Sequence, residues 1–305
     1  MAVTLPQNAV AYEVALPGGT GSRAWRRFAL NPAALVGSLI LLVMVSAAAT
    51  APWIAPHDPA KQSLLRRFTP PMWQAGGNAT YPLGTDQVGR DVLSRIIHGA
   101  RISLWVGLLA VGIGTAAGML IGLVCGYWEG RLDLIMQRLM DAIQAIPGLV
   151  LALAIVSVLK PSTTNAMLAI AIVIIPGNSR IVRGAVLSTK QNRYVEAAQA
   201  MGCRHLRIIA SHILPNVTAP ILVIASIWLG NAILIEATLS FLGLGTQPPT
   251  PSWGLMLSST GRAFMEQAPW LAIFPGMAIS LAVLGFNLFG DTLRDAWDPK
   301  LRRRG

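Results

Sequence analysis

Long apolar runs separated by short polar segments are the main pattern of this sequence. A helix needs roughly 20 apolar residues to cross a hydrocarbon core of about 30 Å. Six runs meet that length, and we predict membrane spans at residues 33–55, 102–127, 136–159, 165–185, 217–240 and 269–291. The pattern therefore predicts an all-α membrane protein with six transmembrane helices.

The first apolar run has two interpretations. Arg23, Arg26 and Arg27 precede it, as basic residues precede the apolar part of a cleaved signal peptide. The apolar part of a signal peptide is only about 7 to 15 residues long, and the run at 33–55 is longer. An uncleaved first span after a polar tail at 1–32 is therefore favoured.

Basic residues set the predicted orientation, because Lys and Arg are retained on the cytoplasmic side of a membrane. With the amino terminus inside, 16 of the 24 Lys and Arg residues face the cytoplasm. Most of the others lie in the outer loop at 56–101, and long loops carry little weight in this rule. Both termini are therefore expected in the cytoplasm, with a core of five spans over 102–291 and a short tail at 292–305.

Small residues recur at every fourth position of the second span. Gly114, Gly118, Gly122 and Gly126 follow Ala110 at this spacing, which places them on one face of a helix. A face without side-chain bulk lets another helix approach closely, as helices do in membranes. We predict that this face packs against a neighbouring span.

Pro-Gly pairs interrupt three of the predicted spans. They are Pro147-Gly148, Pro176-Gly177 and Pro275-Gly276. Proline removes a backbone hydrogen bond and kinks a helix. These spans are expected to bend there, either to fit a static bundle or to move between two states.

Charged residues near and inside the spans form a group of candidates for the outer face or a substrate pathway. In the outer loop these are Asp86, Arg90, Asp91 and Arg95. From Val88 onward the apolar positions recur at helical spacing, which predicts an amphipathic helix on the outer surface or, alternatively, a docking surface or gate. Glu236 lies inside the fifth span, where a charge costs at least about 2.5 kcal/mol. Glu236 has two possible roles. It lies at the membrane interface or packs between helices, or it lines the substrate pathway.

Composition agrees with a membrane location, since 53% of the residues are hydrophobic and 12% are charged. The net charge of +11 comes from basic residues at the ends of apolar runs, so no nucleic-acid partner is expected. Cys125, Cys203 and the four histidines have no metal-binding spacing, so no metal site is predicted. The GGTG sequence at 18–21 lacks the Lys-Ser/Thr of a phosphate-binding loop, so this chain is not expected to hydrolyse ATP.

The segment at 194–216, YVEAAQAMGCRHLRIIASHILPN, is the longest polar, helix-competent stretch between two spans. It predicts a short helix that starts near Glu196, a break at Gly202, and a second short helix that Pro215 stops. Ala197 and Ala198 are expected to form one surface of little bulk. Such a unit between two spans can transmit movement from a partner, whereas the alternative is a plain amphipathic linker on the membrane.

This segment resembles the EAA signature of permease subunits in binding-protein-dependent ATP-binding cassette importers. The matching positions are Glu196, Ala197, Ala198, Gly202, Leu214 and Pro215. His212 stands where the general pattern has Ile. The resemblance implies the type I importer permease fold, with a coupling loop at 190–215 that docks into a cleft on an ATPase subunit.

Further segments narrow the resemblance. LGTDQVGRDVLSR, SFLGLGTQPPTPSWG and DAWDPKLR are similar to the second, C-type permease subunit of dipeptide, oligopeptide and nickel importers, from about residue 30 to the end. The resemblance implies a bacterial inner-membrane protein without enzymatic activity. Its implied partners are a homologous second permease, cytoplasmic ATPase subunits and an extracytoplasmic binding protein. It implies no cofactor on this chain, with ATP and Mg on the ATPase subunits.

Two other functions remain open from the residues alone. A self-contained secondary transporter or channel predicts inverted repeats with paired broken helices, and the sequence shows no convincing internal repeat. A membrane scaffold would keep the glycine spacing but would need no ATPase. We predict a permease subunit that carries di- or oligopeptides and couples to an ATPase through the EAA segment.

Overall fold

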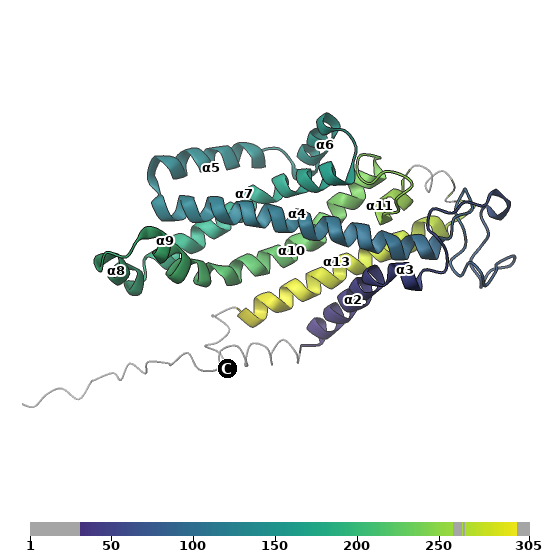
Figure 1. Ribbon diagram of the computed structural model, residues 1–305, viewed down its shortest axis with the longest axis horizontal. Coiled ribbons are helices and arrows are strands. Elements are labelled where there is room, and N and C mark those ends of the chain that lie inside the picture. Colours follow the sequence, from purple (N-terminus) through teal and green to yellow (C-terminus); the bar gives the residue numbers. More distant parts are fainter. Residues whose placement is uncertain (1–30, 259–263, 265, 298–305) are drawn as a thin grey trace, which may run out of the picture.

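The computed structural model describes residues 31–258, 264 and 266–297 and is a bundle of helices (Figure 1). Five helical segments are long and apolar enough to cross a membrane. They are α2 (Pro32–Ala49), α4 (Val92–Trp128), α7 (Thr163–Lys190), the continuous segment His205–Phe241 and α13 (Trp270–Trp297). The predicted fold class, an all-helical membrane protein, is confirmed. Of the predicted tails at 1–32 and 292–305, residues 1–30 and 298–305 lie outside the described residues, and residues 292–297 continue α13.

The third predicted span is not one helix. It consists of α5 (Gly130–Gln144) and α6 (Gly148–Leu159), which are bent by 88° relative to each other. Pro147 stands between them and cannot donate the backbone hydrogen bond that would continue α5. Asp133 of α5 accepts two hydrogen bonds of 2.6 Å from Arg183 and so holds α5 along α7. The bend that Pro147-Gly148 predicted within the span at 136–159 is therefore confirmed, and it is sharp enough to divide the span into two helices.

The glycine face of α4 lies against α7. An added Cβ would stand 2.7 Å from the Ala171 carbonyl oxygen at Gly114 and 2.6 Å from the Ser179 carbonyl oxygen at Gly122. At Gly118 and Gly126 it would meet the Cβ atoms of Asn178 and Val186, each at 2.8 Å. Real Cβ atoms do not come so close to such neighbours, so only glycine permits this approach of the two helices.

The prolines in the other spans do not interrupt their helices, although the sequence predicted bends or a helix end at these positions. Pro176 lies inside α7, Pro275 lies inside α13, and both helices continue through them. Pro215 was expected to stop the second short helix, but it occupies the first turn of α10 (Leu214–Phe241), where its missing N–H removes no helical hydrogen bond. A π-helical turn, η2 (Ile209–Ile213), joins it to the preceding helix. The predicted stop was wrong for this reason.

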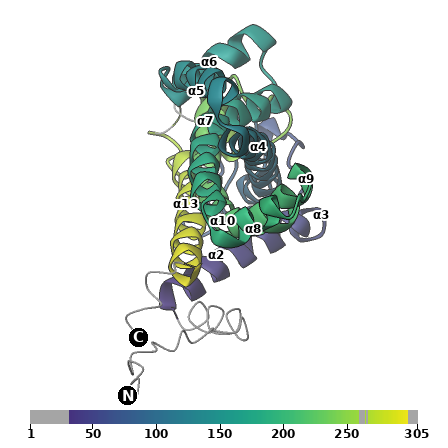
Figure 2. The same cartoon turned by 90° about the vertical axis from the view of Figure 1, so that its left-hand side faces the viewer.

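The two ends of the bundle carry different structures (Figures 1 and 2). At one end lie α3 (Ala51–Ile54), η1 (Leu64–Arg66), the loop up to Asp91, and α11 (Trp253–Met256). At the other end lie α8 (Arg193–Ala200) and α9 (His205–Ile208), with the start of α2 and the end of α13 toward that side. We call the first the outer end and the second the inner end.

The predicted surface helix of the outer loop was also wrong. From Val92 onward its residues form the first turns of α4 itself, and Asp91 is the N-cap of that helix. Asp86, Asp91 and Arg95 are buried rather than turned outward. The apolar spacing that suggested a surface helix belongs to a span that begins ten residues earlier than 102.

Candidate functional site

The predicted coupling loop at 190–215 contains α8, α9 and η2, and a tight turn at Gly202 joins α8 to α9. Gly202 has φ +77°, and its N–H donates to the Gln199 carbonyl at 2.9 Å. A Cβ added there would meet nothing within 4 Å, so the turn needs glycine for its backbone conformation and not for space. The predicted pair of short helices with a break at Gly202 is what the structure contains.

The inward face of the coupling loop shares its core with the spans. Val195 and Ala198 of α8 and Ile208 of α9 are at most 1% exposed. They form one apolar cluster with Tyr127 of α4 and Val186 of α7. Ala198 therefore packs inward, and the expectation that Ala197 and Ala198 form one free surface was wrong for Ala198. A displacement of α8 must move the ends of α4 and α7 with it, because close-packed interiors transmit strain.

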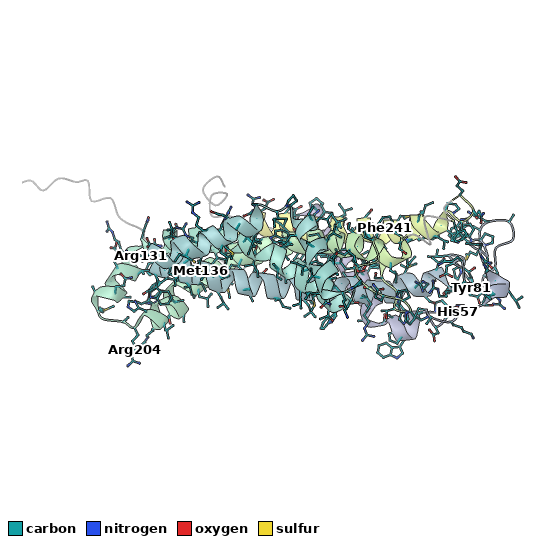
Figure 3. The ribbon with its side chains drawn as sticks, turned by 90° about the horizontal axis from the view of Figure 1, so that it is seen from above. His57, Tyr81, Arg131, Met136, Arg204 and Phe241 are labelled. Atoms are coloured by element: carbon teal, nitrogen blue, oxygen red, sulfur yellow. The ribbon has the colours of Figure 1, made fainter. Side chains whose placement is uncertain are left out.

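The outward face of the coupling loop combines charge with exposed apolar side chains. Glu196 and Ala197 of α8 are exposed, as are Arg204 and Arg207. Met201 and Leu206 are 77% and 75% exposed, one on each side of Gly202. Figure 3 shows Arg204 at the inner tip of the molecule. Of the two remaining predicted coupling residues, Leu214 is half-buried and Pro215 begins α10.

A polar network that no local sequence pattern indicates connects the coupling loop to the spans. The Tyr127 hydroxyl and His205 Nδ1 are hydrogen-bonded at 2.7 Å. Lys190 at the end of α7 donates to the Tyr127 carbonyl at 2.8 Å and to Glu129 Oε1 at 2.7 Å. The network therefore links α4, α7 and α9 at the inner end of the bundle.

Asp86 organises the charged segment at the outer end. Its Oδ1 accepts from the backbone N–H groups of Val88 and Arg90 at 3.0 and 2.9 Å. Its Oδ2 accepts from Arg90 Nε at 2.6 Å and lies 3.8 Å from Arg95 Nε. Both oxygens of this carboxylate therefore have hydrogen-bond partners within the protein. Asp86 is therefore a structural centre of the loop and does not present itself to a partner.

Asp91 has a different role from Asp86. As the N-cap of α4 it accepts from the Ser94 N–H at 3.1 Å, and its other contacts are the Ser94 hydroxyl and His57 Nδ1, the latter at 3.4 Å. An N-cap carboxylate satisfies orphan N–H groups of the first helical turn. Asp91 is 1% exposed, so it holds the start of α4 in place and is not available for docking.

Glu236 is buried where α10 meets α4. Ser103 of α4 donates to its Oε2 at 3.0 Å, and Ser240 of α10 donates to its Oε1 at 2.7 Å. The Ser240 hydroxyl in turn accepts from the Thr246 N–H at 3.0 Å. Glu236 thus joins two helices and the turn that follows α10, with 1% exposure. This position is that of a helix-packing residue.

A cavity of about 840 Å³ opens at the outer end between the segment around Asp86 and the turn after α10. Asp86, Arg90 and Arg95 line it, so the structure brings three of the predicted outer candidates together. Asp91 and Glu236 do not line it. Within the part of the chain that the structure describes, no group of three His, Cys, Asp or Glu residues can hold a metal ion.

Comparison with sequence families gives two matches. The family described as binding-protein-dependent transport system inner membrane component matches residues 118–303. The family described as N-terminal TM domain of oligopeptide transport permease C matches residues 20–71. Together these matches include the coupling loop and the first span.

Individual proteins agree with these families. A di/tripeptide transport system permease protein of Pseudomonas aeruginosa is 48% identical over 278 residues, which covers 91% of each chain. A dipeptide transport system permease protein of Haemophilus influenzae is 47% identical over 279 residues, covering 92% of this chain and 94% of the relative. A solved inward-facing structure of the MetNI methionine ABC transporter is similar with a TM-score of 0.54 at 17% identity, covering 67% of this chain and 96% of that one. The last likeness concerns the fold alone.

Proposed function

Because the chain belongs to the family of binding-protein-dependent transport system inner membrane components, we propose that it forms a translocation pathway for di- and tripeptides together with a homologous second permease. The chain is the multi-pass inner-membrane component of an ATP-binding cassette transporter and not its ATPase. Such a transporter also comprises ATPase, second permease and binding-protein components.

The observation that carries the proposal is the two-sided coupling loop. Its inward face is part of the core of α4 and α7, and its outward face exposes Glu196, Met201 and Leu206. An apolar pair surrounded by charges suits a protein interface, where apolar side chains are central and charged ones lie at the rim. The outward face is the surface on which an ATPase subunit docks in the cytoplasm.

Transport then follows from differential binding. ATP closes the paired ATPase subunits, which move the coupling loop and, through its shared core, the inner ends of α4 and α7. ATP can shift the pathway between inward and outward states only if the two states bind the ATPase or the loaded binding protein with different affinity. The bend between α5 and α6 is the place where the bundle re-packs most readily, because no helical hydrogen bonds cross it.

The peptide cargo is supported by the relatives, since the two proteins compared above are named for dipeptide and di/tripeptide transport. An extracytoplasmic binding protein delivers the peptide to the outer end. No cofactor is bound by this chain, and ATP with Mg is bound by the ATPase subunits.

Reconstitution tests the proposal. The complete transporter in lipid vesicles, with binding protein and ATP, is expected to accumulate a radiolabelled dipeptide, and omission of either ATP or the ATPase subunits is expected to abolish uptake. The chain alone should move no peptide. Uptake by the chain alone, driven by an ion gradient, would show instead a self-contained secondary transporter.

A further inference from the structure

The outer cavity has the size and position of a ligand site. It lies where the start of α4, the end of α10 and the start of α13 meet, and Val92, Phe241 and Leu271 mark these three helices in its wall. Its volume of about 840 Å³ falls within the range of about 300–1,000 Å³ that is usual for small-molecule pockets. Figure 3 shows Phe241 in the half of the molecule that carries His57 and Tyr81. The cavity therefore lies in the outer half of the molecule.

The charges that line the cavity do not balance. Asp86 is the single carboxylate among the lining residues, and it faces two guanidinium groups, those of Arg90 and Arg95. Its oxygens are already occupied by two backbone N–H groups and by Arg90 Nε. Among the described residues of the wall, one positive charge is therefore left without a carboxylate of its own.

The two guanidinium groups also have hydrogen-bond donors to spare. Each arginine carries five N–H donors. Arg90 uses Nε for Asp86, and Arg95 uses Nη1 for the Pro59 carbonyl at 3.3 Å. Three guanidinium nitrogens have no hydrogen-bond partner among the residues that the structure describes. They are Nη1 and Nη2 of Arg90 and Nη2 of Arg95. The side chains are only 13% and 4% exposed, and both residues line the cavity.

A buried guanidinium with unpaired donors favours an anion, because desolvated polar groups gain most from a charged partner. Carboxylates fit best, since the planar fork of arginine binds both oxygens of a carboxylate. Apolar side chains make up another part of the same wall, with Phe241, Leu242, Leu255 and Leu271 among them. The ligand that matches both parts is a small molecule with a carboxylate at one end and an apolar group nearby.

We infer that this cavity binds the peptide cargo at the outer end of the pathway, with the terminal carboxylate on Arg90 and Arg95 and a side chain against the apolar wall. The inference rests on the proposed transport of di- and tripeptides. It gives Arg90 a specificity-determining role, with Arg95 beside it. Asp86 acts as a positioning residue, because it fixes the orientation of both arginines.

The test compares a dipeptide with its carboxy-terminal amide in the reconstituted transporter with saturating binding protein. Uptake is measured for the native chain and for the Arg90→Gln variant. For each chain, the apparent KM for the free peptide is divided by that for the amide, and the two ratios are compared. Any preference of the binding protein for one peptide cancels in this comparison, because it is the same for the native chain and the variant. The control is Arg101→Gln, which removes an exposed arginine of α4 that does not line the cavity.

Arg90→Gln is expected to raise the apparent KM for the free peptide about tenfold and to leave that for the amide within about twofold. Arg90→Lys should give an intermediate KM for the free peptide, because lysine keeps the charge but not the fork. Arg101→Gln should leave the apparent KM unchanged for both peptides. The amount of copurified subunits shows whether each variant assembles.

Three results would overturn the inference. Equal KM increases for both peptides would assign the carboxylate to the binding protein or give Arg90 a purely structural role. Unchanged KM values would show that the cavity does not bind cargo. A native transporter that moves no peptide would remove the proposed function as well, and this measurement is made first so that the two failures are distinguished.

Discussion

The outer and inner ends of this molecule are both polar connections between spans, but they are built in opposite ways. The outer end buries its charges, since Asp86 and Arg95 are 5% and 3% exposed and are held by partners within the loop. The inner end buries Val195 and Ala198 and exposes Glu196 and Leu206. The charges of the outer end are thus buried and paired largely within this chain, around a cavity, whereas the inner end exposes its charges and apolar side chains on a protein-docking surface.

One helix joins the two ends. α4 has 37 residues, and at 1.5 Å per residue it is about 55 Å long. Asp91 caps it at the outer end, and Tyr127 binds His205 at the inner end. Its glycine face, from Gly114 to Gly126, fixes the inner part of this helix to α7. The difference between the two ends therefore predicts that changes at the outer end affect stability and changes at the inner end affect coupling.

The largest effect is expected at Asp86. Asp86→Ala leaves Arg90 and Arg95 without their carboxylate, and breaking a buried ion pair costs about 3–5 kcal/mol. Thermal unfolding of the purified transporter should show a clearly lowered midpoint. Asp58→Ala removes an exposed carboxylate of the same loop and should change the midpoint little. Equal effects of the two variants would contradict a structural role of the buried cluster.

The next effect concerns the helix that links the ends. Gly122→Ala places a Cβ 2.6 Å from the Ser179 carbonyl oxygen, and overpacking of this kind costs about 1–3 kcal/mol. Gly112→Ala in the same helix meets nothing within 4 Å. The yield of assembled complex should fall for the first variant and stay normal for the second. Normal assembly of both would mean that α4 and α7 separate without cost.

A smaller stability effect and a larger functional one are expected at Gly202. Alanine at φ +77° costs about 1–2 kcal/mol, and it changes the angle between α8 and α9. Gly130→Ala imposes a similar strain at φ +70°, outside the coupling loop, with open space around it. Both variants should lose similar stability, but only Gly202→Ala should lower peptide uptake per ATP hydrolysed. If Gly130→Ala lowered peptide uptake per ATP by the same amount, backbone strain alone would explain the uncoupling.

The smallest effect on stability is expected at the outward face of the coupling loop. Leu206 is 75% exposed, so Leu206→Ser should leave the unfolding midpoint unchanged and reduce the amount of ATPase that copurifies. Leu65→Ser provides the comparison at the outer end, where Leu65 is fully exposed, and it should leave the ATPase bound. If the Leu206→Ser variant retained all of its ATPase, Leu206 would not be part of the interface.

The sequence predicted those features that follow from local patterns. Apolar length predicted the spans, the spacing of Gly114 to Gly126 predicted a packing face, and Gly202 predicted a break between two short helices. Each of these depends on residues close together in the chain. The structure adds for the glycine face only the identity of its neighbour, which is α7.

The features that failed depend on contacts between distant residues. Whether Pro147 breaks a span while Pro176 does not is decided by packing, since the pair of Asp133 and Arg183 holds α5 along α7. The burial of Arg95 requires Pro59 and Asp86, which precede it by 36 and 9 positions. The Tyr127–His205 hydrogen bond spans 78 residues. No periodicity within a segment contains such information.

The most direct test of the account asks whether the ATPase covers the outward face of the coupling loop. Met201→Cys, in a chain without Cys125 and Cys203, is labelled with a maleimide in the complete transporter and after removal of the ATPase subunits. Leu65→Cys at the outer end is the control. The account predicts that the ATPase slows labelling of Met201→Cys at least about tenfold, as burial in an interface requires, while Leu65→Cys reacts equally in both states. Equal labelling of Met201→Cys with and without the ATPase would contradict it.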